Sequence, residues 1–324
     1  MAKNAEFSGY DAEMLKRIDD ILPERIFDAH THAEGLVDYE AHMRSWFGPR
    51  RRLRINMFPM PRAEMADPVS GRAAAPLEAA MERLRRHLEA APDCVGELLT
   101  APGDTAEELE AGFLAAGGPG RIVGVKPYHL LAVKKPTDQA DIGEYLPEAA
   151  LELAEKYRLA VTLHLVKDGA LADPANLRAV RRMARAFPNA KLVLAHAGRS
   201  FAAWTGLEGI PQTADLDNVF FDFSAVCEVP VLLMALRKAG LSRCMWGSDY
   251  PVALLAGRAI SLGGGFAWLG EKALAAMGSA GETACLVGTE NLQAMWQLVR
   301  LEELGPSDRE ALFYGNACRV LLGE

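Results

Sequence analysis

Residues 26–32 read IFDAHTH, an apolar run that ends in two histidines. Side chains alternate along a β-strand, so His30 and His32 are predicted to point to one face, and Asp28 shares their parity one layer deeper. Imidazole and carboxylate groups are the usual protein ligands of Zn²⁺ and similar ions. The motif therefore predicts a strand that presents metal ligands at its end.

Three more strand-like runs end in a candidate ligand: His164 in AVTLHL, His196 in KLVLAHAG and Asp249 in CMWGSDYP. A single histidine at a strand end is more often structural than functional. Four histidines and one aspartate at successive strand ends favour a metal site, which the fold must gather from positions far apart in the chain. The other three histidines, His42, His87 and His129, lie outside this series.

Strand and helix signals alternate along the chain. Helical patterns lie between the strands, such as EAALELAEKY at 148–157 and the run after Asp173-Pro174. This alternation predicts parallel strands joined by helices. Candidate strands lie at 26–32, 53–58, 94–99, 121–128, 160–166, 191–197, 219–226 and 244–249.

A barrel explains the ligand series better than an open sheet does. An open sheet binds ligands where two neighbouring strands diverge, whereas a barrel brings all its strand ends around one mouth. The length of 324 residues is enough for an α/β barrel with additions. We therefore expect a slightly elaborated (β/α)₈ TIM barrel that forms a single domain over residues 1–324.

Three segments are expected to elaborate this barrel. Residues 1–23 are predicted to form an N-terminal helical extension. Residues 34–76, which contain five prolines, are expected to form a long irregular insertion after the first strand. Residues 252–305 exceed one crossover and are interpreted as an elaborated segment after the eighth strand, with a loop at Gly263–Gly265.

The composition of the chain indicates which binding partners and which cellular compartment to expect. A net charge of −8 argues against nucleic acid as a partner. Five separated cysteines without a CxxC pair suit reduced thiols in the cytoplasm. The chain shows no signal-peptide pattern and no apolar stretch near the ~20 residues of a membrane helix. We expect a cytoplasmic protein with a small-molecule substrate. The sequence is compatible with a homo-oligomer and does not decide the oligomeric state.

The motifs together resemble those of the amidohydrolase superfamily, in its amidohydrolase-related (type 2) branch. The resemblance covers about residues 24–322 and rests on DAHTH, GVK at 124–126, the two later strand-end histidines, GSDYP at 247–251 and NACRVL at 316–321. It implies a (β/α)₈ barrel with one or two divalent metals at its C-terminal mouth. The reactions it implies are hydrolysis of amides, esters and lactones, and non-oxidative decarboxylation.

The resemblance assigns roles residue by residue. His30 and His32 match the ligand pair of the first strand, His164 the ligand of the fifth, and Asp249 the aspartate of the eighth, which binds metal and handles the proton of the bound water. His196 matches the sixth-strand histidine, which is often an acid/base or oxyanion stabiliser in one-metal members and a metal ligand in two-metal members. The expected catalytic residues are therefore Asp249 and His196.

Lys126 decides how many ions the site would hold. In two-metal relatives a lysine of the fourth strand is carbamylated and bridges the ions, whereas in the type 2 branch it more often stays cationic and holds a substrate carboxylate. We favour one divalent ion, Zn²⁺ ahead of Mn, Fe or Co, together with a cationic Lys126. A plain structural lysine is the third interpretation. Arg199, after His196, is a further candidate for substrate binding.

These assignments favour a metal-dependent hydrolase that acts with metal-activated water on a small, anionic lactone, amide or ester. The alternative is a metal-dependent decarboxylase of an aromatic or unsaturated acid on the same scaffold. A barrel without catalysis is a third interpretation, and the intact ligand set counts against it.

Overall fold

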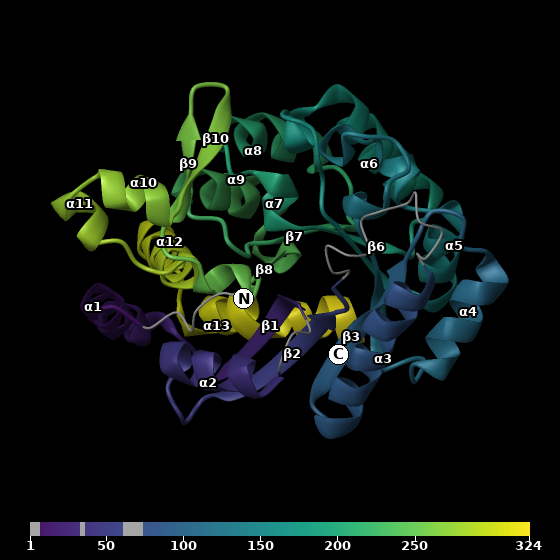
Figure 1. Cartoon of the computed structure of the whole chain (residues 1–324), viewed down its shortest axis with the longest axis horizontal. Helices are drawn as coiled ribbons and strands as arrows, with labels where there is room; N and C mark the ends of the chain where they lie inside the picture. Colours follow the sequence, from purple (N-terminus) through teal and green to yellow (C-terminus); the bar gives the residue numbers. More distant parts are fainter. Residues whose placement is uncertain (1–6, 33–35, 61–73) are drawn as a thin grey trace.

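The computed structural model describes residues 7–32, 36–60 and 74–324, and within them eight parallel strands form one sheet (Figure 1). Each strand pairs with the next one along the chain. Each of the eight runs expected to be strands contains a strand, and the last four strands end three or four residues earlier than expected. They are β1 (Arg25–His32), β2 (Arg52–Phe58), β3 (Cys94–Thr100), β4 (Ile122–Pro127), β5 (Ala160–Leu163), β6 (Lys191–Leu194), β7 (Val219–Asp222) and β8 (Cys244–Met245).

The first strand meets the segment that follows the last one, which brings the two edges of the sheet together. The amide of His32 donates to the carbonyl of Tyr250 at 2.9 Å, and the amide of Asp249 donates to the carbonyl of His30 at 2.8 Å. The amide of Ala29 donates to the carbonyl of Trp246 at 3.2 Å. The strands thus form a nearly closed (β/α)₈ barrel, and we call this line of contact the seam.

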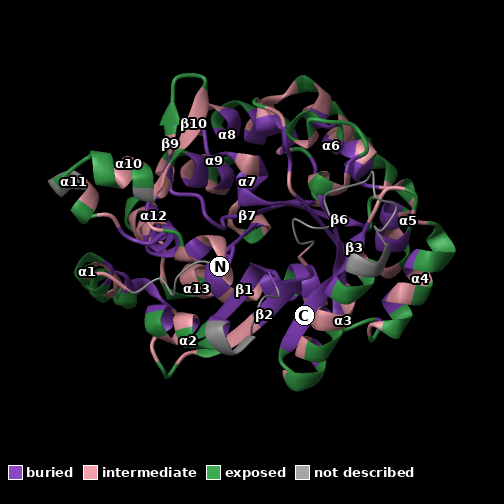
Figure 2. Cartoon of the chain, viewed as in Figure 1, coloured by how far each residue is buried: buried purple, intermediate pink, exposed green. Residues whose placement is uncertain are grey.

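Helices surround the strands, and they bury one face while their outer faces are exposed (Figure 2). Such layering follows from the amphipathic helical pattern in the sequence. The helices are α1 (Gly9–Ile18), α2 (Leu36–Phe47), α3 (Ala74–Ala90), α4 (Ala106–Ala115), α5 (Glu148–Tyr157), α6 (Pro174–Ala186), α7 (His196–Arg199), α8 (Ala203–Gly209), α9 (Val229–Ala239), α10 (Glu271–Ala276), α11 (Ser279–Glu282), α12 (Val287–Leu301) and α13 (Pro306–Glu310).

The barrel interior holds its own apolar cluster. Strand residues such as Phe27, Val95, Val123 and Val193 pack there against the C-terminal helical segment η12 (Cys318–Leu322). A larger cluster fills the space between the strands and the surrounding helices. Because both faces of the strands are covered, the strands read as apolar runs in the sequence.

The expected irregular insertion at 34–76 was wrong for the part that is described. Residues 36–47 form α2 and residues 52–58 form β2, which makes this segment a regular part of the barrel. The prolines misled the prediction because they mark boundaries: Pro49 follows α2 and Pro59 follows β2. Residues 34–35 and 61–73 lie outside the described residues.

The two other elaborations contain regular structure. Residues 9–21 form α1 and the short helix η1 (Asp19–Ile21), in line with a helical N-terminal extension. After β8 come the strands β9 (Arg258–Leu262) and β10 (Gly265–Leu269), which pair antiparallel, followed by α10, α11 and α12. The glycine run expected as a loop is thus the turn of a hairpin, and Gly263 adopts a φ of 59° there.

None of the helices in the described residues is long and apolar enough to cross a membrane.

Candidate metal centre

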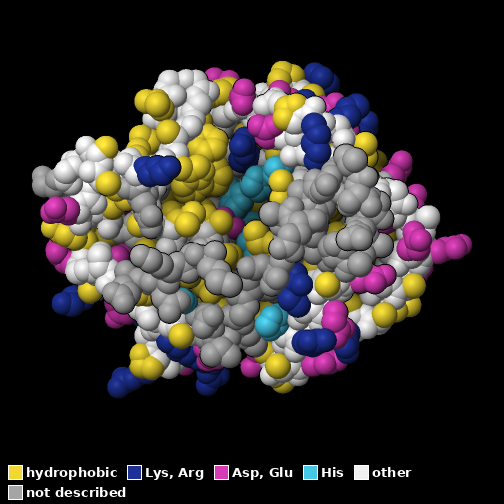
Figure 3. All heavy atoms as spheres, in the orientation of Figure 1, with side chains coloured by type: hydrophobic (Ala, Val, Ile, Leu, Met, Phe, Trp, Pro, Cys, Tyr) yellow, Lys and Arg dark blue, Asp and Glu magenta, His cyan; other side chains and the backbone are white. Residues whose placement is uncertain are grey.

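The residues singled out in the sequence lie at the carboxyl ends of the barrel strands. His30 and His32 end β1, Lys126 lies at the end of β4, and Asp222 ends β7. Figure 3 shows histidine side chains in a hollow in the middle of this face. The three others lie just beyond a strand: His164 directly follows β5, His196 follows β6 after Ala195, and Asp249 lies in the segment 246–249 after β8.

An irregularity in β1 separates Asp28 from the two histidines. The pairing of β1 with β2 shifts register between Asp28 and Thr31, so the simple alternation of side chains fails there. Asp28 accepts a hydrogen bond from the hydroxyl of Tyr39 on α2 at 2.9 Å. The expectation that Asp28 lies beneath the histidines on the same face was therefore wrong. Burial raises the pKa of Asp28 to about 6.

Asp249 lies across the seam from both histidines of β1. Its Oδ1 is 3.4 Å from Nε2 of His30 and 3.2 Å from Nε2 of His32. All three side chains are buried. Gly247 allows this approach, because a Cβ there would lie only 2.7 Å from Cβ of His30. The seam thus brings together ligand atoms from the first strand and from the segment after the last strand.

Asp222 holds two histidines through its two carboxylate oxygens. Oδ2 is 3.0 Å from Nδ1 of His30. Oδ1 accepts a short hydrogen bond from the hydroxyl of Ser224, whose backbone carbonyl and hydroxyl oxygens each lie 3.0 Å from Nδ1 of His196. Carboxylate and carbonyl oxygens only accept, so Nδ1 carries the hydrogen in both rings. Each ring therefore has its lone pair on Nε2.

The charge of Asp222 suits this role. Burial opposes its ionisation, but His30 and then His196 and Ser224 outweigh burial and hold the pKa of Asp222 below its usual range. Asp222 is not among the site residues predicted from the sequence. An aspartate between two phenylalanines at a strand end was the available signal.

The most compact group of ligand atoms includes His196. Among the described residues, one set of three such side chains has all its ligand atoms within 4.8 Å of one another: His30, His196 and Asp249. His32 joins this set through Asp249, whereas His164 stands beside it, with its ring centre 5.0 Å from that of His196. The geometry gives His196 a more central place than the expected acid/base role.

A divalent cation fits this arrangement. Asp222 accepts a hydrogen bond from Nδ1 of His30, so the lone pair of this ring is on Nε2. Nε2 lies 3.4 Å from Oδ1 of Asp249. Only a proton or a metal ion makes such a contact favourable. Burial lowers the pKa of His30 to about 4, so the ring is neutral at pH 7. Neutral imidazoles and an ionised aspartate are the donor set that divalent transition metals bind.

The ionised state of Asp249 completes this picture. Burial would raise the pKa of Asp249, but His196, His32 and His30 around it lower the pKa to about 2. Burial also lowers the pKa of His32, and it lowers that of His164 well below the usual value. The carboxylate of Asp249 therefore lies beside neutral rings of His30 and His32, a charge distribution that suits a bound cation.

Lys126 is buried near the donor group. Its ammonium lies 4.4 Å from the ring centre of Phe58 and 5.4 Å from that of Tyr128. Burial lowers its pKa, while the charges of Glu97, Asp222 and Asp249 oppose that shift. The aromatic faces and the carboxylates both favour the cationic form.

Arg199 lies at the end of a strained turn that begins at His196. His196, Ala197 and Arg199 have positive φ values of 55°, 52° and 58°, which non-glycine residues seldom adopt. The guanidinium donates to the carbonyl of Lys167 at 3.0 Å and lies 5.3 Å from the ring centre of Phe266. Strain of this kind persists where surrounding structure enforces it, often at a functional site.

Two residues after β4 join the site and were missed in the sequence. The hydroxyl of Tyr128 lies 2.9 Å from Nδ1 of His32. His129 stacks on His164 with ring centres 5.5 Å apart, although it was placed outside the ligand series. Their position just beyond Lys126 at a strand end was the signal that could have identified them.

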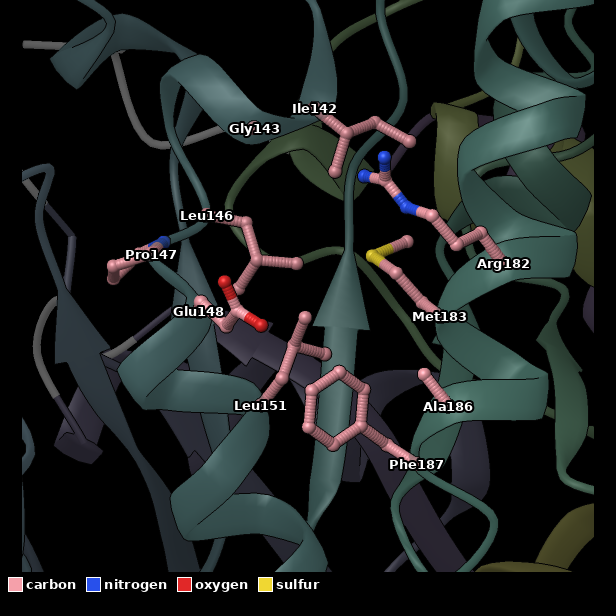
Figure 4. A pocket seen from close by; sticks show the side chains of 10 residues that line it. All are labelled: Ile142, Gly143, Leu146, Pro147, Glu148, Leu151, Arg182, Met183, Ala186 and Phe187. Atoms are coloured by element: carbon pink, nitrogen blue, oxygen red, sulfur yellow. The ribbon is translucent and has the colours of Figure 1, made fainter.

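A groove on the flank of the barrel is separate from this site. It has a volume of about 400 Å³ and lies between α5 and α6 (Figure 4). Apolar side chains such as Leu146, Leu151 and Phe187 form its floor, with Glu148 and Arg182 beside them. None of the candidate site residues, all of which the structure describes, lines this groove.

Comparisons with known proteins were made on the sequence and on the fold. A family model described as "Amidohydrolase" matches residues 27–322. No curated protein matches the sequence.

Several solved structures share the fold. An amidohydrolase from Burkholderia multivorans is 15% identical, with a TM-score of 0.55 over 91% of this chain and 98% of the other. 2,6-Dihydroxybenzoate decarboxylase from Rhizobium is 14% identical, with a TM-score of 0.55 over 93% and 98%. 5-Carboxyvanillate decarboxylase from Novosphingobium aromaticivorans, solved with manganese, is 14% identical, with a TM-score of 0.55 over 97% and 84%. At these identities the likeness shows the fold.

Proposed function

The chain belongs to the amidohydrolase family, and from this premise we propose that it is a metal-dependent hydrolase of a small anionic lactone, amide or ester. The observation that carries this proposal is the arrangement around Asp222. Asp222 binds Nδ1 of His30 directly and Nδ1 of His196 through Ser224, so that Nε2 of His30 faces Asp249 at 3.4 Å and the ring of His196 lies beside the same carboxylate.

The proposed cofactor is one divalent ion, with Zn²⁺ ahead of Mn, Fe or Co. His30, His32, His164 and Asp249 are the proposed ligands, and the compact donor group makes His196 a competitor of His164 for the fourth place. A bound divalent ion lowers the pKa of water and polarises a carbonyl group. A second ion would require carbamylation of Lys126, and the ring faces of Phe58 and Tyr128 beside its ammonium favour the cationic form instead.

Asp249 and His196 are the proposed proton carriers. The ionised carboxylate of Asp249 can accept a proton from water and pass it to the leaving group. His196 can accept a proton at Nε2, because its Nδ1 hydrogen is donated to the Ser224 carbonyl. Once it has gained that proton, His196 can donate from Nε2 to an oxyanion.

Two cations are proposed to select an anionic substrate. Lys126 supplies a buried ammonium close to the donor group, and Arg199 supplies a half-buried guanidinium at the same end of the barrel. A carboxylate on the substrate would replace the water that these charges lose on burial.

A decarboxylase is the second candidate, and the buried ammonium of Lys126 favours it. A cation so close to the donor group can hold the carboxylate that is to be lost, and His196 or Asp249 can deliver the proton to carbon. The two candidates use the same residues and differ in the bond that breaks.

Product analysis separates them. The metal-loaded protein should be incubated with panels of sugar lactones, N-acyl amino acids and hydroxybenzoates, while acid release and CO₂ release are followed in parallel. We expect acid release without CO₂. CO₂ release without hydrolysis would replace the hydrolase with the decarboxylase, and metal content far below one equivalent after loading would contradict both.

Metal analysis of single variants tests the ligand set. His30→Ala and His32→Ala are expected to lose the ion. His196→Ala should keep about one equivalent with most turnover lost if His164 is the fourth ligand. Retention of the ion in His164→Ala with its loss in His196→Ala would reverse the two roles.

The cytoplasm remains the proposed compartment. All five cysteines are free and buried in the structure, which suits a reducing environment.

A further inference from the structure

The hairpin β9–β10 adds an aromatic surface beside the donor group. Phe266 and Trp268 are two residues apart on β10 and therefore share a face. Both rings contact Phe201, with ring centres 5.3 Å and 5.2 Å away, and the ring of Phe201 lies 5.2 Å from that of His196. We call these three residues, Phe201, Phe266 and Trp268, the aromatic wall.

The wall runs from the buried site to the solvent. Phe201 is 5% exposed, whereas Trp268 is 41% exposed. In Figure 3 hydrophobic side chains border the hollow that holds the histidines, on the side where Figure 1 shows β9 and β10. Aromatic surface left exposed on a monomer often marks a binding site.

Hydrogen bonds fix the hairpin to the barrel. The indole of Trp204 on α8 donates to the carbonyl of Gly264 at 2.9 Å, and the amide of Ala203 donates to Oγ of Ser261 at 2.8 Å. The amide of Ser261 donates to Glu228 at 3.0 Å. The rings are therefore held in place before any ligand arrives, which lowers the entropic cost of binding.

Cations accompany the wall. Arg199 lies over the ring of Phe266, and Lys126 lies over Phe58 and Tyr128 near the donor group. A ligand that satisfies both features has a planar aromatic ring for the wall and a carboxylate for the cations.

We propose that the aromatic wall binds the ring of an aromatic carboxylate, so that Phe266 and Trp268 determine the substrate class. This proposal rests on the proposed function, because it places that ring in the same site. It applies equally to hydrolysis and to decarboxylation, and it distinguishes both from action on sugar lactones or on aliphatic N-acyl amino acids.

The first test compares two acids on the metal-loaded protein. Benzoate and cyclohexanecarboxylate carry the same charge and the same number of carbons, but only benzoate is planar. Dissociation constants from ligand-detected NMR titration should favour benzoate by about 5-fold, the order expected for an aromatic pair. Equal affinities would overturn the proposal without any variant.

The second test assigns the preference to the wall. Phe266→Leu and Trp268→Leu keep an apolar side chain and remove the ring, so the preference for benzoate should fall to about 1 to 2-fold. Leu262→Ala is the matched control, because Leu262 lies on the same hairpin and is 66% exposed outside the wall. It should keep the full preference, and thermal melting checks that all three variants fold.

Two outcomes contradict the assignment. A preference for benzoate that survives both leucine variants would place its origin elsewhere. The second outcome is that light scattering gives the two leucine variants a different molecular mass from the wild type, while their preference for benzoate is unchanged. The aromatic wall would then be an interface between copies of the chain. Inactivity in the substrate panel would refute the proposed function alone, since the binding comparison needs no turnover.

Discussion

Asp222 determines the state of two histidines that come from different strands. Its oxygens bond to Nδ1 of His30 directly and to His196 through Ser224. Carboxylate partners of this kind fix the tautomer of a metal-binding histidine and raise its basicity. The proposed metal site therefore depends on a residue that is not itself a proposed ligand.

We expect Asp222→Asn to lower metal affinity by about 10 to 100-fold while the protein stays folded. The amide keeps the shape of the side chain, but its NH₂ group can face Nδ1 of His30 and move the hydrogen of that ring to Nε2. Metal titration with a chromophoric chelator measures the loss. Asp215→Asn, at an exposed aspartate paired with Arg181, is the control and should leave the affinity unchanged. Equal affinities in the two variants would contradict the role of Asp222.

Glu97 is a buried acid inside the barrel near Lys126. Its Oε1 accepts hydrogen bonds from Asn56 at 2.9 Å and from Thr162 at 2.7 Å, while its Oε2 has no partner among the described residues. Burial raises its pKa to about 7, against the opposing effect of Lys126. The folded state thus keeps a proton on Glu97 that the unfolded chain loses near its ordinary pKa of 4.5.

This difference predicts a pH dependence of stability. Between pH 4.5 and about 7 the folded state binds more protons than the unfolded state, so the free energy of unfolding falls as pH rises through this range. The loss is on the order of 3 kcal/mol. Glu97→Gln should remove it. Urea unfolding of both proteins at pH 5 and pH 8 measures the effect, and identical changes in the two proteins would refute it.

At the scale of elements, local patterns predicted most of the barrel. The run 148–157 became α5 with the same bounds, and Asp173 caps α6 through the amides of Ala175 and Asn176. Both depend on side chains within a few residues of one another, which is the information that a sequence displays directly. The positions of the eight strands followed for the same reason, although the last four end earlier than expected, and they located most of the candidate site.

The rest of the site depended on contacts that no local pattern encodes. The register shift in β1 redirected Asp28, and the roles of Asp222 and His129 depend on neighbours from other strands. The hairpin β9–β10 is a different case, because two alternating runs joined by Gly263-Gly264 are a hairpin signal. The three consecutive glycines are also typical of a loop, and on that basis the sequence predicted a loop at residues 263–265.

At the scale of the whole molecule, the seam unites the fold and the site. Gly247 is the point of closest approach, since a Cβ there would lie 2.7 Å from Cβ and 2.9 Å from the backbone nitrogen of His30. Any side chain at this position must push β1 away from the segment after β8. The displacement would also move the ligand atoms of His30 and Asp249 apart.

We expect Gly247→Ala to destabilise the protein by about 1–3 kcal/mol, as overpacking of a core does, and to weaken metal binding as well. Urea unfolding and metal titration measure the two effects. Gly143→Ala is the matched control, because an added Cβ there meets no heavy atom within 4 Å. A metal affinity unchanged from the wild type in Gly247→Ala would show that the seam and the site are independent.

The seam also has a kinetic consequence. His32 and Asp249 are 217 residues apart in the chain, so we expect their contact to form late in folding, because closing so long a loop is entropically costly. An unclosed sheet has not yet assembled the donor group and offers no place for the ion to guide early folding. An ion bound across the closed seam instead opposes its reopening. Its main effect would be to slow unfolding, so that the same residues that serve chemistry also set the lifetime of the folded chain.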